Sequence, residues 1–224
     1  MAVTGLLLFF FVVAHLAGNL QVFLGPEAIN RYGDFLQSNV ELLWPARIGL
    51  LAIVGLHIWS AIQLSVENRA ARPQAYERHE IVAASYASRT MLWSGFIVLA
   101  FIIYHLLHFT AQVTAINGTG KNFESLHDAE GRHDVFAMMV TGFRNPIVAG
   151  FYVVAMFLLC LHLSHGLSAM FQSLGWKTPA YAPCIDGAAK VVSWLIFAGY
   201  VSIPISILVF GYGQKYLSAR GLLP

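Results

Sequence analysis

The stretch that decides the fold runs from Phe143 to Trp176 and reads FRNPIVAGFYVVAMFLLCLHLSHGLSAMFQSLGW. Between residues 146 and 174 it contains no Asp, Glu, Lys or Arg. An α-helix needs about 20 apolar residues to cross a hydrocarbon core of roughly 30 Å, so this run is long enough to span a membrane. It carries two histidines, His162 and His165, which are three residues apart and therefore share one face of the predicted helix.

The composition of the whole chain also indicates a lipid environment. Of its 224 residues, 58% are hydrophobic and 11% are charged, whereas a soluble domain has about 25% charged residues. Four more apolar runs are long enough to span, and the polar segments between them hold nearly all the charges. The sequence predicts one all-α domain over residues 1–224, an integral membrane bundle of five transmembrane helices at about residues 3–24, 45–66, 91–113, 146–174 and 188–212.

Turn and capping residues set these boundaries. The first run has no basic segment before it and no A-x-A cleavage pattern, which favours a transmembrane helix over a signal peptide. The pair Gly25-Pro26 breaks this helix, and Pro45 suits the first turn of the next one. In the polar segment 114–145, residues 133–140 predict a short interfacial helix. Tryptophans lie near the proposed helix ends, as interfacial aromatics do: Trp44, Trp93, Trp176 and Trp194.

Charge and cysteine content exclude several classes of function. A formal net charge of +2, spread along the loops, is too small for nucleic-acid binding. Cys160 and Cys184 lack the Cys-x-x-Cys spacing of zinc or iron–sulfur sites, so we expect two free thiols. The density of Lys and Arg in loops 67–90 and 171–190 favours a topology with the N-terminus inside.

Histidines within the spans are the residues that indicate chemistry. The chain has nine histidines, and five of them fall at membrane depth: His15, His57, His105, His108 and His162. Ionisable side chains are costly there and mark function by default. With a rise of 1.5 Å per residue, position along each helix sorts the histidines into two levels. His15 and His105 lie beyond the midplane from the N-terminus, and His57 and His162 lie on the N-terminal side.

Two histidine pairs at two levels suit two six-coordinate haems, each held by imidazoles from two helices. Spacing alone leaves His105 and His108 open as alternatives, and likewise His162 and His165, although depth favours His105 and His162. Small residues lie near the histidines and leave room for a porphyrin, or permit close helix packing: Gly18, Gly55, Ser60 and Gly166.

Four segments together resemble one family, the five-helix dihaem cytochrome b subunits that anchor succinate dehydrogenase and fumarate reductase, respiratory complex II. The segments are MAVTGLLLFFFVVAHLAGNLQVF, LHIWSAIQL, SGFIVLAFIIYHLLHF and the stretch 143–176 quoted above, and the resemblance extends over essentially the whole chain. The resemblance implies that His57 and His162 bind a proximal haem b near the cytoplasmic subunits. It implies that His15 and His105 bind a distal haem b near the outer face. It also implies a multi-pass protein of the bacterial cytoplasmic membrane.

The resemblance also implies partners. A flavoprotein subunit would oxidise succinate, an iron–sulfur subunit would pass the electrons on, and this chain would carry them through both haems to a quinone, menaquinone in preference to ubiquinone. The chain would act only as a subunit of this oxidoreductase, because the dicarboxylate and flavin sites would lie on the other chains. The complex could form a higher oligomer. Some fumarate reductases have a glutamate two residues before the ligand on the fourth helix, where this chain has Cys160.

Further site residues are expected near the two levels. Quinone reduction needs polar groups that exchange protons with the carbonyl oxygens, and the first outer loop offers Asp34, Gln37 and Glu41. Glu41 is favoured, although it would serve equally as a solvated carboxylate at a helix start. Arg89, just before the third span, is a candidate partner for a propionate of the proximal haem.

Three other readings compete with the complex II anchor. A dihaem carrier of the hydrogenase type or the cytochrome b561 type would use the same four histidines with different partners. A transporter or membrane metalloenzyme would relay protons or hold a metal through them. Such sites usually include intramembrane carboxylates, and the proposed spans contain none. A purely structural anchor would need none of the four ligands.

Overall fold

The computed structural model describes residues 1–71 and 91–223, and within them the chain is all-helical. Five helices are long and apolar enough to cross a membrane. They are α1 (Ala2–Asn19, continued by the 3-10 turn η1, Leu20–Leu24), α3 (Val40–Ala70), α5 (Met91–His105, continued by the π-helical turn η2, Leu106–Thr110), α7 (Pro146–Ser173) and α8 (Ala182–Leu208). The shorter helices are α2 (Pro26–Ser38), α6 (Val135–Phe143) and α9 (Gln214–Ala219).

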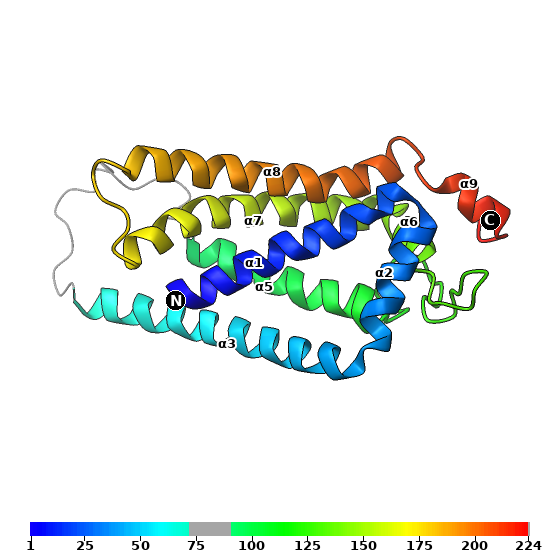
Figure 1. Cartoon of the computed structure of the whole chain (residues 1–224), viewed down its shortest axis with the longest axis horizontal. Coiled ribbons are helices and arrows are strands. Elements are labelled where there is room, and N and C mark those ends of the chain that lie inside the picture. Colours follow the sequence, from blue (N-terminus) through cyan, green and yellow to red (C-terminus); the bar gives the residue numbers. More distant parts are fainter. Residues whose placement is uncertain (72–90, 224) are drawn as a thin grey trace.

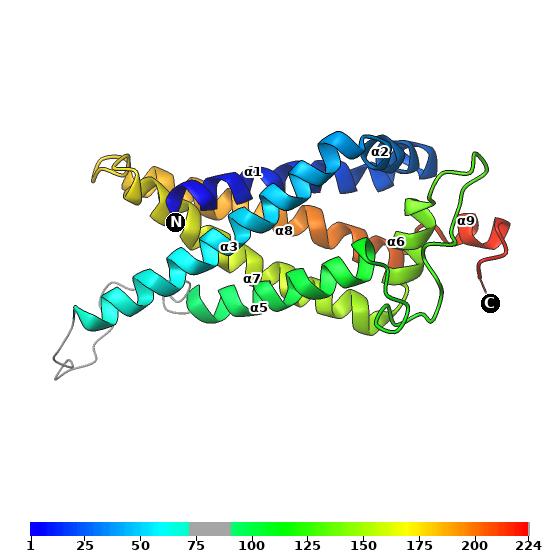
Figure 2. The same ribbon diagram turned by 90° about the horizontal axis from the view of Figure 1, so that it is seen from below.

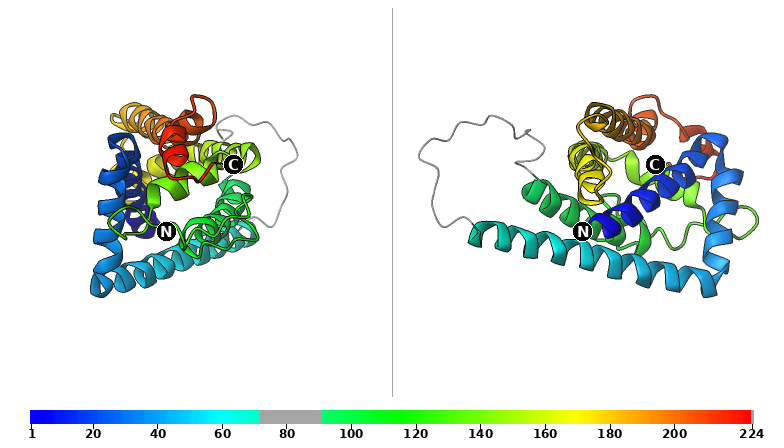
Figure 3. Two further views of the ribbon diagram at one scale, coloured as in Figure 1. Left: turned by 90° about the vertical axis from the view of Figure 1, so that its right-hand side faces the viewer. Right: turned by 60° about the vertical axis from the view of Figure 1, so that its left-hand side comes forward.

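The long helices lie side by side with alternating directions (Figure 1). α1, α5 and α8 run away from the end that holds the N-terminus, and α3 and α7 run back, so the chain termini lie at opposite ends. α7 packs along α8, and α1 and α5 also pack on α7. α3 crosses the other helices obliquely (Figure 2) and buries none of its residues. Viewed along the long axis, α3 and α8 lie on opposite sides of the bundle (Figure 3).

The second span begins earlier than predicted. Pro45 was expected in its first turn, but α3 starts at Val40 and Pro45 lies inside it. The carbonyl oxygen of Asn39 accepts hydrogen bonds from the amides of Leu42 and Leu43, at 3.0 and 2.9 Å, which closes a turn before the proline. Pro45 lies one turn further on and lacks the amide hydrogen that would bond to the carbonyl oxygen of Glu41, so α3 continues past it with one hydrogen bond fewer.

The segment between the first two spans was expected to be a polar connection, and this expectation was wrong. It forms α2, which begins with Pro26 at the favoured first position and has Glu27 in its first turn, where a carboxylate interacts well with the helix dipole. α2 lies across the end of the bundle in Figure 1 and buries Ile29 and Asn30. The predicted interfacial helix at 133–140 is confirmed as α6, which starts two residues later.

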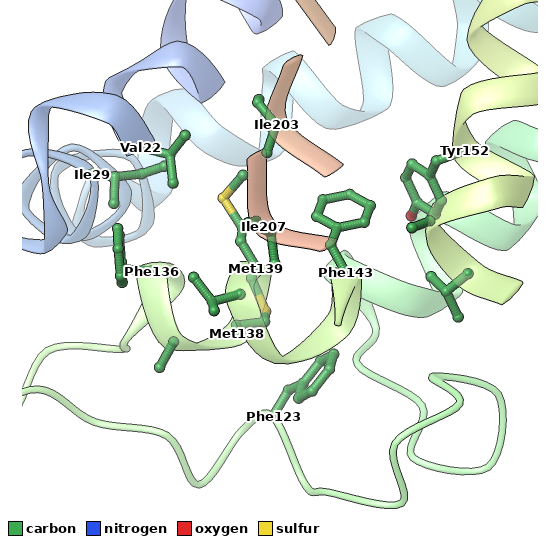
Figure 4. Packing of buried hydrophobic residues seen from close by; sticks show 14 of the residues in the cluster. Val22, Ile29, Phe123, Phe136, Met138, Met139, Phe143, Tyr152, Ile203 and Ile207 are labelled. Atoms are coloured by element: carbon green, nitrogen blue, oxygen red, sulfur yellow. The ribbon is translucent and has the colours of Figure 1, made fainter. Parts of the chain in front are cut away.

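The main hydrophobic core lies at the end of the bundle away from the N-terminus. Every residue of α6 except the first is buried there, against α2, α8 and α9 (Figure 4). Phe136, Phe143 and Ile207 are among the residues in this core, with exposures of 5% or less. A second, smaller cluster around Leu167 and Met170 lies near the N-terminal end of α1. The two clusters fix the helices at both ends.

A polar network also holds the α6 end together. Asp134 is fully buried, and its carboxylate accepts hydrogen bonds from Ala137 N, Asn30 Nδ2 and Tyr216 Oη at 2.9, 3.1 and 2.8 Å. It thus caps α6 and ties it to α2 and α9. The phenol bonded to this carboxylate is also partly desolvated, and burial followed by this hydrogen bond raises the pKa of Tyr216 to about 12.

Candidate functional site

The structure brings the predicted histidines together in the predicted pairs. The rings of His15 and His105 have their centres 5.8 Å apart, with an angle of 82° between their planes. The rings of His57 and His162 are 6.5 Å apart at 63°. All four side chains are half-buried. Each pair joins two helices: α1 with α5, and α3 with α7. These are the two pairs that depth along the helices favoured in the sequence.

The proximal pair, His57 and His162, is supported by two hydroxyl groups. His57 Nδ1 lies 3.1 Å from Thr4 Oγ1, and His162 Nδ1 lies 3.3 Å from Ser94 Oγ. In both histidines the hydroxyl contact is thus to Nδ1, which leaves Nε2 as the nitrogen for a ligand. A histidine that binds a metal usually has its other ring nitrogen held in this way.

The distal pair, His15 and His105, is supported differently. Tyr152 Oη lies 3.2 Å from His105 Nδ1 and 3.0 Å from His108 Nδ1, so one phenol bridges the two histidines of α5 and η2. The ring of His15 stacks on Phe11, at 5.3 Å and 16°. The alternative that the sequence left open in this helix now has a geometric answer, because it is His105, not His108, whose ring faces His15.

His108 occupies a separate, enclosed position. Its side chain is fully buried in the π-helical turn η2 and packs against the rings of Phe109 and Phe123. Its Nε2 has no hydrogen-bond partner among the described residues. Gly142 lies against this nitrogen, and a Cβ there would come within 3.2 Å of it. The side chain is therefore a packed neighbour of the distal pair.

The spacing of both pairs fits a haem with two axial imidazoles. Bonds of about 2 Å from one iron to two opposed ring nitrogens place the ring centres roughly 6 Å apart. Both observed separations, 5.8 and 6.5 Å, are close to this value. Among residues 1–71 and 91–223, no three His, Cys, Asp or Glu side chains come together as a metal-ion site would need. A haem needs only two protein ligands, because its own nitrogens supply the other four.

The small residues near the histidines differ in what surrounds them. A Cβ added at Gly166, one turn from His162, would meet no atom within 4 Å, so that side of α7 is open. The same holds at Gly55. Gly18, by contrast, leaves no room beside His15, because a Cβ there would lie 2.8 Å from the ring of Tyr32 in α2. Of the two alternatives that the sequence left open for the small residues, close helix packing therefore applies to Gly18.

A cleft of about 350 Å³ opens beside the distal pair. Phe109 connects the two sites, because its ring centre lies 6.0 Å from that of His105 and the same ring lines the cleft. Gln112, on the cleft wall, has a φ of +52°, a conformation that residues other than glycine rarely adopt. The lining residues come from α2, α3, η2 and the segment after it: Gln37, Val40, Leu43, Trp44, Arg47, Phe109, Thr110 and Gln112.

The residues predicted for the quinone site differ in whether they line this cleft. Gln37 lines it, as expected for a residue near the distal pair, but Glu41 is exposed in the first turn of α3 and is not part of the lining. Asp34 is exposed as well. Arg47, which was not predicted, does line the cleft, and its guanidinium lies 5.4 Å from the ring of Trp44. Arg89 falls outside the described residues.

Sequence analysis missed Thr4, Ser94 and Tyr152 as neighbours of the histidines. A signal for the first two was present, because Thr4-Gly5 and Ser94-Gly95 each stand eleven residues before a paired histidine, His15 and His105 respectively. α1 and α5 thus share one pattern: a hydroxyl residue is followed by a glycine, then by nine further residues, and then by a histidine. At 1.5 Å per residue, the hydroxyl and the histidine of each helix lie about 16 Å apart along its axis, which separates the two levels.

These features define a class: the chain is a helical, multi-pass membrane protein with two pairs of facing histidines between its spans. Comparison with protein-family models, with the curated proteins and with the solved structures finds no match to this chain. The argument for its function therefore rests on its own residues.

Proposed function

We propose that the chain is the membrane anchor and cytochrome b subunit of a succinate:quinone oxidoreductase, a succinate dehydrogenase or fumarate reductase. Its role would be to bind two haems b and carry electrons from a partner iron–sulfur subunit to a quinone. The observation that carries the proposal is the pairing of four histidines from four helices, at 5.8 and 6.5 Å between ring centres. The order of the four sequence segments that resemble the family supports the choice among dihaem proteins.

In this proposal each histidine pair has one task. His57 and His162 would hold the proximal haem, and His15 and His105 the distal haem, with Nε2 of each ring toward the iron. When bound, the two haems would pass single electrons along the membrane normal. The protein would keep the imidazoles of His57, His162 and His105 fixed through Thr4, Ser94 and Tyr152, respectively, at Nδ1.

The quinone would enter the cleft beside the distal pair. Its volume of about 350 Å³ is in the range of small-molecule sites. Trp44 and Phe109 offer flat apolar surfaces to a quinone ring, and Gln37, Arg47 and Gln112 offer donors to its carbonyl oxygens. Gln112 Nε2 lies 3.0 Å from His133 Nε2, so a titratable imidazole stands directly behind the cleft wall. Burial lowers the pKa of His133, which favours the neutral imidazole that can accept the amide hydrogen of Gln112.

The test is a reduced-minus-oxidised absorption spectrum of the purified complex, with quantification of haem b per chain. We expect about two haems in the unsubstituted protein and loss of a different one in His15→Ala and in His57→Ala. His127→Ala, at an exposed position near the bundle end, is the matched control and should keep both. A protein without haem b would sink the electron-transfer proposal and favour the transporter reading. Copurification of a flavoprotein and an iron–sulfur protein separates complex II from other dihaem carriers.

A further inference from the structure

The hydroxyl residue and glycine that occur at matching positions of α1 and α5 also make matching contacts, each pair with one proximal histidine. Thr4 of α1 reaches His57 of α3, and the next residue, Gly5, lies against the same ring, since a Cβ there would be 3.4 Å from His57 Cε1. Ser94 of α5 reaches His162 of α7, and a Cβ at Gly95 would be 3.7 Å from His162 Cε1. Each imidazole therefore rests on a hydroxyl group and on the bare backbone of the following glycine.

Each of these two hydroxyl groups donates its hydrogen to a backbone carbonyl oxygen. Thr4 Oγ1 donates to the carbonyl oxygen of Met1 at 2.9 Å, and Ser94 Oγ donates to that of Met91 at 3.0 Å. A carbonyl oxygen can only accept, and each hydroxyl has one hydrogen. Toward the imidazole the hydroxyl oxygen must then be the acceptor. Nδ1 must be the protonated nitrogen, and Nε2 carries the lone pair.

We propose that Thr4-Gly5 and Ser94-Gly95 are matched positioning elements that fix the tautomer and orientation of the two proximal histidines and set the reduction potential of the proximal haem. This inference rests on the proposed haem function. A neutral acceptor at Nδ1 strengthens the electron donation of Nε2 to the iron, which favours the oxidised state. Because two such contacts act on one iron, one at each axial ligand, their effects on the proximal haem add.

The distal pair lacks this arrangement. His105 Nδ1 shares the phenol of Tyr152 with His108, and a phenol has one hydrogen to give, so Tyr152 can donate to only one of the two rings. The two levels of the site thus present different partners to their imidazoles. The hydroxyl and glycine pattern is therefore specific to the proximal level, and its removal should leave the distal haem unchanged.

The experiment is a potentiometric titration of both haems, with electron paramagnetic resonance spectra of the oxidised complex, on Thr4→Val, Ser94→Ala and the double variant. Thr4→Ser and Ser94→Thr restore the hydroxyl groups. Ser164→Ala is the matched control, because Ser164 is two residues from His162 but its hydroxyl bonds to the carbonyl oxygen of Leu161. These readouts report on the ligands of the iron, and a purely structural serine or threonine would not shift them.

We expect each single variant to keep two haems and to shift the equilibrium of the proximal haem toward the reduced form by up to tenfold. For one electron this is a positive shift of up to about 59 mV. The distal potential, the hydroxyl-restoring variants and Ser164→Ala should match the unsubstituted protein. Loss of the proximal haem alone in either variant also supports the proposal, since such contacts raise metal affinity.

Three results would overturn the inference: an unchanged proximal potential in both single variants, an equal shift in Ser164→Ala, or loss of both haems in both single variants. Failure of the proposed function is seen separately and earlier. It would appear as the absence of any haem b spectrum in the unsubstituted complex, before a variant is made.

Discussion

At the scale of single residues, two neighbouring polar side chains differ in what they can reach. Gln37 and Glu41 are four residues apart in sequence and both were candidates for the quinone site. Gln37, near the end of α2, lines the cleft beside the distal histidines, whereas Glu41 points to the outside of α3. The break between the helices at Asn39 separates them, because it turns the chain sharply between the two positions.

We predict that Gln37→Leu raises the KM for a soluble quinone analogue about tenfold, since one lost hydrogen bond to a bound ligand corresponds to roughly 1.4 kcal/mol. Glu41→Gln should leave the KM unchanged. Steady-state succinate oxidation by the complex, with the quinone concentration varied, measures both. An unchanged KM in Gln37→Leu would remove the cleft from consideration as the quinone site.

The residues of the paired-histidine site show what sequence could and could not supply. Depth along the apolar helices separated the histidines into two levels and favoured His105 over His108 and His162 over His165, and the family resemblance made the choice between them. Thr4 and Ser94 were not recognised, since a hydroxyl that bonds to its own helix backbone looks the same in sequence whether or not an imidazole is beside it. Tyr152 was missed for a related reason: aromatic residues are common in apolar spans.

At the scale of elements, the short helices were the hardest to predict, because they do not have the characteristic length of a membrane span. α2 has only a few apolar residues and follows a Gly-Pro break, so it resembled a loop, but tertiary contacts with α6 hold it in place. Pro45 misled the prediction of where α3 begins, because a proline fits a first turn and is tolerated one turn later. Asp134 is the residue on which the packing of α2, α6 and α9 converges.

Replacement of Asp134 by alanine should therefore destabilise the protein by about 2–4 kcal/mol, because it removes the cap of α6 and leaves buried donors without an acceptor. Asp34→Ala, at an exposed position in α2, should change stability by less than about 0.5 kcal/mol. Unfolding in mixed micelles of increasing denaturing detergent gives both free energies. Equal stability of the two variants would contradict the central role of Asp134.

At the scale of the whole molecule, charged side chains join separate segments at the α6 end of the bundle. The α6 end has a surface network in which Arg132 contacts Glu27, Asp128 and Glu130. The hydrogen bond from Arg132 lowers the pKa of Glu27. Burial of Asp128 acts in the opposite direction, but the hydrogen bonds from Arg132 and its neighbours prevail and lower its pKa too. Both carboxyl groups are thus held in their charged form when the protein is folded.

A carboxyl group with a lowered pKa in the folded state stabilises that state above its unfolded pKa, near 4, and loses this effect as the pH falls through the folded value. We therefore predict that amide protection in α2 and in residues 122–134, measured relative to the intrinsic exchange rate at each pH, falls below about pH 4, while the centres of α7 and α8 stay protected. Hydrogen exchange with mass spectrometry measures it. Arg132→Ala should show the faster exchange already at pH 6, and identical profiles of the two proteins would contradict the prediction.

The repeated hydroxyl, glycine and histidine pattern has a consequence for protein design. α1 and α5 run in parallel, as do α3 and α7, and each pair of facing histidines takes one member from each antiparallel hairpin (Figure 1). In both hairpins the first helix also carries the hydroxyl group and the glycine that support the histidine of the second. A designed α1–α3 hairpin that dimerised in parallel would therefore bring its own histidines together as both pairs.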